Sequence, residues 1–163
     1  MSEAKLCILD AGPIIHLDQL GALDLIGELG HVVVTETVAI EAERHRPELD
    51  VAAHFEIVID AEIVPSRVVF AASKHSLDLG ELAALAWGET HNADMFVSDD
   101  KKARLAAMEL GYEITGTLGV IMHATRRGII TKAAGIALLE RIPNESTLHV
   151  RHNLLAETIG ELR

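Results

Sequence analysis

The sequence predicts an α/β fold in which a mainly parallel sheet carries helices on both faces. Short apolar runs rich in β-branched residues alternate along the chain with segments whose apolar residues have helical spacing. Strands connected by helices favour parallel pairing, because each helix returns the chain to the same edge of the sheet. The 163 residues, 49% of them hydrophobic, are enough for one continuous core. We therefore expect a single domain over residues 1–163.

The N-terminal half shows the alternation in its simplest form. Pro13 suits the first position of a helix, where its missing N–H has no partner to lose, and Pro47 ends one. In chain order, the predicted elements are a strand at Leu6–Leu9, a helical region from Pro13 that Gly21 divides, a strand at His31–Thr35, a helix over 36–46 and a short helix over 47–55.

Residues 56–75 give conflicting signals, because β-branched residues favour strands whereas Pro65 would interrupt one. The sequence leaves this stretch unassigned. Beyond it, the predicted elements are a helix from Leu79, a strand at Met95–Val97, a helix over 101–110, a strand at Glu113–Thr115, and helices over 117–127 and 132–141, with Pro143 following the last. The tail from Leu148 is left unassigned.

Charge and cysteine usage limit the classes of function. Fourteen Lys and Arg against 25 Asp and Glu give a net charge of −11, so any contact with nucleic acid needs a local basic patch. Asp10, His16 and Asp18 interrupt the apolar N-terminal stretch, which argues against a membrane span and a signal peptide. Cys7 is the single cysteine, which excludes a disulfide framework. We expect a cytoplasmic protein with no membrane segment.

Four acidic residues are candidates for one site. Asp10 and Asp99 each follow an apolar strand, and in parallel sheets the functional crevice lies beyond the carboxyl ends of the strands. Glu81, near the start of a helix, and Glu41, within one, can face the same crevice. Carboxylates this close raise one another's pKa, and a divalent cation relieves the repulsion. Hard oxygen ligands without a matching Cys or His set favour Mg²⁺ or Mn²⁺, which suits phosphodiester hydrolysis by a metal-activated water.

Each acid also has a purely structural interpretation. Asp10 can start a turn, and residues 78–81 resemble a capping box. Asp99 or Asp100 can cap the helix that follows. Glu41 lies in a charged run that is typical of a solvated helix face. Taken singly, the residues leave both interpretations open.

Other chemistries have less support. A phosphotransfer domain also places an Asp after its first strand, but Ala11 and Gly12 follow Asp10 where a second Asp is expected. Ser98 lacks a Gly-x-Ser-x-Gly context, and no Gly-x-Gly-x-x-Gly follows any predicted strand. Serine hydrolase chemistry and nicotinamide binding are therefore disfavoured.

Taken in order, the acidic motifs resemble the PIN-domain family, to which the toxin ribonucleases of VapC-type toxin–antitoxin pairs belong. The resemblance is strongest over residues 5–130. The Gly80-Glu81 pair resembles a branch of the family in which Glu supplies the third acid. The motifs are Leu9–Pro13, Val34–Glu41, Gly80–Ala84, Val97–Asp100 with Arg104 one helical turn beyond, Gly116–Gly119 and Arg126–Gly128.

This resemblance implies a three-layer α/β/α sandwich and a metal-dependent endoribonuclease. It implies that Asp10, Glu41, Glu81 and Asp99 are the catalytic and metal-binding acids, with Asp100 as the alternative fourth ligand and Mg²⁺ or Mn²⁺ as the cofactor. The expected partners are RNA, an antitoxin protein and a second copy of the chain. The nearest candidates for a positive rim on the RNA backbone are Lys101, Lys102, Arg104, Arg126 and Arg127.

The rival hypothesis is a non-catalytic PIN-like module that binds nucleic acid or a protein partner. In that case the acids serve folding or metal-stabilised structure, and metal affinity without RNA cleavage would distinguish it.

Overall fold

The computed structural model describes residues 3–163, and its centre is a five-stranded sheet in the order β3-β2-β1-β4-β5. All four neighbouring pairs are parallel, which confirms the predicted α/β class and makes the sheet parallel throughout. The strands are β1 (Leu6–Leu9), β2 (His31–Thr35), β3 (Glu56–Val58), β4 (Met95–Val97) and β5 (Glu113–Thr115).

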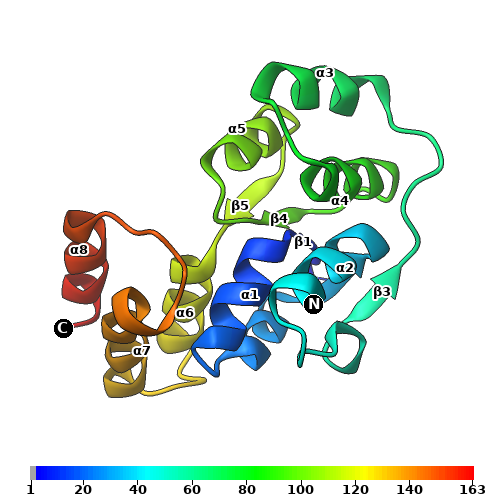
Figure 1. Ribbon diagram of the computed structural model, residues 1–163. Coiled ribbons are helices and arrows are strands. Elements are labelled where there is room, and N and C mark those ends of the chain that lie inside the picture. The colour runs from blue at the N-terminus through cyan, green and yellow to red at the C-terminus, as the bar shows by residue number, and fades with distance from the viewer. Residues whose placement is uncertain (1–2) are drawn as a thin grey trace.

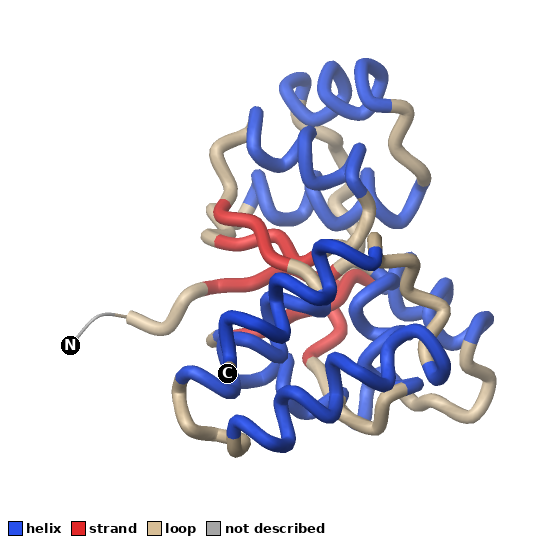
Figure 2. The backbone as a smooth tube through the Cα atoms, turned by 90° about the vertical axis from the view of Figure 1, so that its left-hand side faces the viewer, coloured by secondary structure: helices blue, strands red, loops and turns tan. Residues whose placement is uncertain are grey.

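Helices cover both faces of the sheet, as a three-layer α/β/α sandwich requires (Figure 1). One face carries α3 (Ser66–His75), α4 (Leu79–Thr90) and α5 (Lys101–Glu109). The other carries α1 (Ala11–Gln19), the 3-10 helix η1 (Leu23–Leu29) and α6 (Thr117–Arg126). Outside these lie α2 (Glu36–His45) against α1 and α4, α7 (Lys132–Glu145) against α6, and α8 (His152–Leu162) against α7. Figure 2 shows the strands enclosed between the two helical layers.

The buried apolar side chains form one cluster around the central strand β1. Cys7, Ile8 and Leu9 are fully buried, as are Phe96 and Val97 on the neighbouring strand. A strand buried on both faces reads as a continuous apolar run, which is why these strands could be found in the sequence. The core fixes the carboxyl ends of β1 and β4 relative to each other.

Most predicted elements are confirmed within a residue or two of their ends, but the expected helix over 47–55 is wrong. Only a short 3-10 turn, η2 (Val51–Ala53), forms there. Val51 is fully buried and its N–H donates to Glu43 Oε1 (3.1 Å), whereas most of its neighbours are exposed. A segment with a single buried residue has no apolar stripe to hold a helix in place.

The last helix pair differs from the prediction as well. Pro143 was expected to lie beyond a helix over 132–141, but α7 continues through it to Glu145. Ile142 is fully buried and its carbonyl accepts from the N–H of Ser146 (3.1 Å), so core packing outweighs the proline in this last turn. The unassigned tail forms α8.

The unassigned stretch over 56–75 contains both kinds of structure. Its first residues form β3, and α3 begins directly after Pro65. Val68 and Ala71 are buried at helical spacing, so the tertiary contacts of α3 override the strand preference of its valines. Among residues 3–163, none of the helices is both long enough and apolar enough to span a membrane.

The strand order places a topological switch between β1 and β4. From β1 the chain proceeds outward to β2 and β3, then returns past β1 to form β4 and β5 on its other side. In open α/β sheets, the crevice at such a switch point is where ligands bind. Asp10 follows β1, and Ser98 and Asp99 follow β4, at this position.

Candidate functional site

A cleft of about 330 Å³ opens where β1 and β4 end, at the switch point of the sheet. The structure brings all four predicted acids to its lining, together with the alternative ligand Asp100. The acids that line the cleft are Asp10, Glu41, Asp78, Glu81, Asp99 and Asp100.

Asp10 is the most deeply placed of these acids. Its N–H donates to the carbonyl of Val97 (2.9 Å), which extends the β1–β4 ladder by one bond. Its Oδ1 accepts from the N–H of Ala11 (2.8 Å) as the N-cap of α1, and its Oδ2 accepts from Ser98 Oγ (2.7 Å). The residue is 6% exposed. Burial, reinforced by the nearby carboxylates of Asp78 and Glu41, raises the pKa of Asp10 to about 7 despite these hydrogen bonds.

Glu81 serves two purposes at the start of α4. The predicted capping box is present: Asp78 Oδ1 accepts from the N–H of Glu81 (2.8 Å), and Glu81 Oε2 accepts from the N–H of Asp78 (3.0 Å). Glu81 is nevertheless 7% exposed in the cleft. Burial is the largest cause that raises its pKa to about 7, and the carboxylates of Asp10, Asp78 and Asp100 add to it. Capping occupies one carboxylate oxygen and leaves the other for the cleft.

Glu41 reaches the cleft from α2 and lies against the first turn of α4. Burial and the neighbouring Asp78 raise the pKa of this half-buried carboxyl. Its Oε2 lies so close to Gly80 that a Cβ at that position would collide with it. This close approach gives a physical reason for the Gly80-Glu81 pair: the glycine makes room for one acid and the next residue supplies another.

Asp99 follows β4, but most acceptor positions of its carboxylate are filled by groups of the protein itself. Its Oδ1 accepts from the N–H of Thr117 (2.7 Å), and its Oδ2 accepts from Thr117 Oγ1 (2.6 Å) and pairs with His16 Nδ1 (2.7 Å). A carboxylate offers about four acceptor positions, and three of them are filled here. Asp99 therefore joins α1, β4 and α6 at the rim of the cleft.

Asp100 caps the next helix, which identifies the member of the Asp99–Asp100 pair that does so. Its Oδ1 accepts from the N–H of Ala103 (2.9 Å) at the start of α5. The side chain also contributes to raising the pKa of Glu81. Of the two neighbouring acids, Asp100 is the one that acts electrostatically on the buried carboxyl of Glu81.

Four residues that organise this site were not predicted from the sequence to do so. Asp78 was interpreted only as a cap, yet it faces the same cleft as Glu81. Ser98 holds Asp10, while His16 and Thr117 hold Asp99. The signal for Thr117 was available, because it comes two residues after β5 at the same edge of the sheet. Nothing local marks His16 as a partner of an acid 83 residues away.

The predicted basic residues do not form one rim. Lys101 and Lys102 are exposed on the first turn of α5, and Arg127 is exposed at the end of α6. Arg104 and Arg126 line a second, larger groove that adjoins the cleft. Arg126 is paired there with Glu161 (2.6 Å).

The donor set of the cleft fits a hard divalent cation. Within residues 3–163, no three His, Cys, Asp or Glu groups stand arranged as a ready-made metal site. The chemistry of the lining nevertheless suits Mg²⁺ or Mn²⁺: Asp10, Glu41 and Glu81 offer oxygen ligands, and no Lys or Arg of the described chain lines the cleft to neutralise them. Buried carboxylates without a counter-charge are costly, and a cation would relieve that cost.

The comparison with known families agrees with this geometry. A family model described as a PIN domain matches residues 6–163, and so extends beyond the 5–130 range of the strongest resemblance into α7 and α8. A comparison with curated proteins gave no match. PIN domains are typically nucleases, generally use divalent metals and bind nucleic acid. With its five-stranded parallel sheet and its acidic cleft at the switch point, the chain belongs to the PIN-domain family.

Proposed function

We propose that the protein is a divalent-metal-dependent endoribonuclease in which Asp10, Glu41 and Glu81 hold Mg²⁺ or Mn²⁺. The observation that carries this proposal is the gathering of carboxylates from β1, α2 and α4 in one cleft, where burial raises the pKa of two of them to about 7. Groups with such perturbed pKa values concentrate at functional sites.

The fourth acid of the site is assigned from the remaining oxygens. Asp100 uses one oxygen as a helix cap and acts electrostatically on Glu81, so its second oxygen is the better-placed ligand. Asp99 has most of its acceptor positions filled by Thr117 and His16. We assign Asp99 a positioning role: it holds α1, β4 and α6 together at the rim of the cleft, on the side where the substrate would lie.

A bound cation would lower the pKa of a water molecule and neutralise the charge that develops on the phosphate. The residues of the chain keep the site in shape for that chemistry. Ser98 and the N–H of Ala11 fix the carboxylate of Asp10, and the capping box fixes that of Glu81. Ligands held by such hydrogen bonds are oriented before the substrate arrives.

The deciding experiment is cleavage of a mixed pool of single-stranded and structured RNA by the purified protein in Mn²⁺, Mg²⁺ or EDTA, beside Asp10→Asn. The proposal predicts metal-dependent cutting that the variant loses. Absence of cutting in every condition would contradict it.

A specific observation favours the rival, a non-catalytic PIN-like module. Asp10, Asp78, Glu81 and Asp100 all accept backbone N–H groups at helix starts, so each has a structural role without any reaction. Calorimetry separates the two proposals: metal binding without RNA cleavage would support the module.

The resemblance to toxin ribonucleases supports a further set of proposals about partners. We propose a cytoplasmic toxin that forms a homodimer and is held inactive by an antitoxin protein. Induced expression should then arrest growth, and expression of Asp10→Asn should not. Light scattering of the purified chain gives its subunit number, and a monomer would contradict the dimer.

A further inference from the structure

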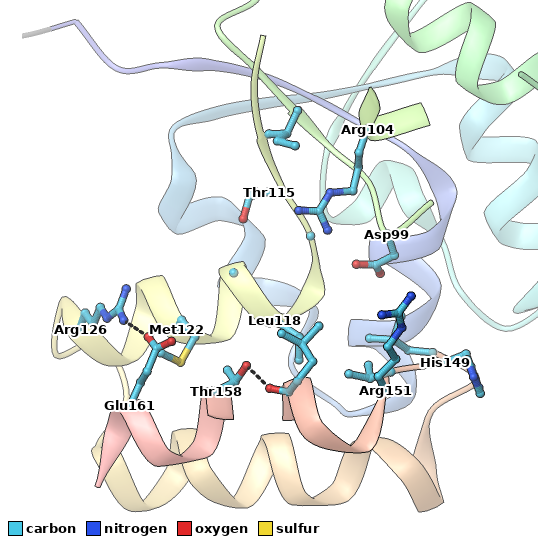
Figure 3. A pocket seen from close by; sticks show the side chains of 16 residues that line it. Asp99, Arg104, Thr115, Leu118, Met122, Arg126, His149, Arg151, Thr158 and Glu161 are labelled. Atoms are coloured by element: carbon cyan, nitrogen blue, oxygen red, sulfur yellow. Dashed lines mark hydrogen bonds and ion pairs between the residues drawn. The ribbon is translucent and has the colours of Figure 1, made fainter. Parts of the chain in front are cut away.

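A groove of about 630 Å³ lies next to the acidic cleft, between α6 and the C-terminal helix α8 (Figure 3). Asp99, Leu148 and His149 line both cavities, so the groove adjoins the cleft. A strand bound across the cleft would therefore pass into this groove.

Two arginines face each other across the groove. Figure 3 shows Arg104 of α5 and Arg151, at the start of α8, extending their guanidinium groups from opposite walls into the space beside Asp99. In the part of the chain that the structure describes, neither guanidinium has an ion-pair or hydrogen-bond partner. A guanidinium matches the oxygens of a phosphate with two parallel hydrogen bonds, so this pair suits a phosphodiester backbone.

The acidic groups of the groove are already engaged. Glu161 pairs with Arg126 (2.6 Å), and Asp99 accepts from Thr117 and pairs with His16. The positive charges of the groove that have no acidic partner among the described residues are therefore those of Arg104 and Arg151.

Part of the lining of the groove is apolar. Leu118, Met122, Val150 and Leu154 line it, and Leu154 is 49% exposed. An apolar wall beside two phosphate-binding groups suits a nucleotide, whose base or sugar can lie on the wall while its phosphate meets the arginines.

We propose that this groove holds the RNA nucleotide next to the scissile phosphate, with Arg104 and Arg151 on its phosphate and Leu154 on its base; the inference rests on the proposed nuclease function. The charge distribution makes such a groove necessary. The chain as a whole carries −11, and the titratable groups that line the cleft among residues 3–163 are carboxylates and imidazoles, with no Lys or Arg. The RNA strand must therefore be bound by the surface that adjoins the cleft.

The test is the binding of a fluorescently labelled single-stranded RNA of twelve nucleotides, measured by anisotropy at low salt in EDTA so that no cleavage occurs. Arg104→Gln and Arg151→Gln should each weaken binding about tenfold, and each should reduce the slope of log K against log salt by about 0.7. Lys132→Gln, which removes an exposed cation at the start of α7, outside the groove and the cleft, is the matched control and should bind like the parent protein. All variants should melt at the parent temperature.

A second pair of variants tests the apolar wall. Leu154→Ser should weaken binding of the same RNA about threefold, and the loss should vanish with an RNA whose bases are replaced by abasic sites. Phe70→Ser removes a similarly exposed apolar side chain on α3 and should change nothing.

Parental affinity and salt slope in the double variant Arg104→Gln/Arg151→Gln would overturn the inference, and so would a parent protein that binds no RNA. If these substitutions abolish binding of a protein partner but leave RNA binding intact, the groove is a protein interface instead. The proposed nuclease activity is judged separately by metal-dependent cleavage and its loss in Asp10→Asn. Failure of the groove and failure of the catalytic proposal therefore give different results.

Discussion

The acidic cleft and the arginine groove lie side by side at one edge of the sheet, yet they are built in opposite ways. The cleft draws its charges from buried carboxylates fixed by backbone N–H groups, at the cost of raised pKa values. The groove draws its charges from guanidinium groups on helix starts that face solvent. Buried acidic groups with raised pKa values suit catalysis, whereas charged groups without an ion-pair partner suit ligand binding. Substitutions in the cleft should therefore impair RNA cleavage, whereas substitutions in the groove should impair RNA binding.

The largest expected effect is on cleavage. Asp10→Asn removes a charged ligand, while the amide oxygen can still accept from the N–H of Ala11 and the amide NH2 can donate to Ser98 Oγ, so we expect metal-dependent RNA cleavage to fall at least about a hundredfold. Affinity for RNA in EDTA should not fall, because the groove is untouched. Asp50→Asn, which removes an exposed carboxylate from the start of η2, is the control. Parental cleavage by Asp10→Asn would remove Asp10 from the site.

Glu81→Gln separates the two roles of this residue. A glutamine oxygen can still accept the N–H of Asp78, so the capping box should persist and the melting temperature in EDTA should not fall. The Mn²⁺-dependent rise in melting temperature should shrink and cleavage should drop, because a charged ligand is lost. Asp78→Ala is the converse variant, since it removes the N-cap and should lower stability by about 1 kcal/mol. Unchanged metal stabilisation in Glu81→Gln would leave the residue as a cap alone.

The buried carboxylates should also make the metal-free protein sensitive to pH. Asp10 and Glu81 have folded-state pKa values of about 7, above the ordinary 3.8 and 4.5, so the folded state binds protons more tightly than the unfolded state. The stability that the protonated carboxyls of Asp10 and Glu81 contribute to the folded state is fully present below about pH 4. It is lost as the pH rises through about 7. In EDTA, Asp10→Asn should therefore melt a few degrees above the parent at pH 8, with a smaller difference at pH 5.

Arg104→Gln provides the contrast for this titration. It lies in the groove and should leave the pH dependence of the melting temperature as it is. An equal gain in melting temperature for Asp10→Asn at both pH values would show that protonation of the buried carboxyl does not govern stability.

The smallest effect concerns the space between α2 and α4. In Gly80→Ala, the added Cβ would collide with the Glu41 carboxylate and displace it, so we expect metal affinity to fall about tenfold by calorimetry. Gly160→Ala is the matched control, because a Cβ at that position of α8 meets nothing within 4 Å. It should instead gain about 0.5 kcal/mol from helix propensity. Equal metal affinity in both variants would show that Glu41 binds no metal.

Much of the fold could be predicted because its strands are buried and carry a local signal. The runs that form β1 and β4 end directly before polar residues, so Asp10 and Asp99 could be placed at strand ends, and the capping box at Glu81 depends only on nearby residues. The partners of Asp99 could not be predicted in this way. His16 is 83 residues away and meets Asp99 only through the tertiary fold.

The same distinction explains the remaining errors. Val68 and Val69 favour a strand locally, but the face that α3 buries decides their structure. Arg151 carried no motif, and its place opposite Arg104 depends on how α8 packs on α7. Of the predicted basic residues, Arg104 and Arg126 line the groove, and the prediction that they bind RNA omitted Arg151, which faces Arg104.

The pairing of β1 with β4 has a consequence for how the protein is made. Ser98 reaches Asp10 across 88 residues of sequence, and the N–H of Asp10 bonds to Val97. During translation the first acid emerges long before the strand that completes its surroundings, and contacts over such separations form slowly. A ribosome-bound fragment that ends before Asp99 has no cleft, and one that ends before Arg151 has no complete groove. The proposed nuclease therefore has no complete cleft until β4 and Asp99 have been made.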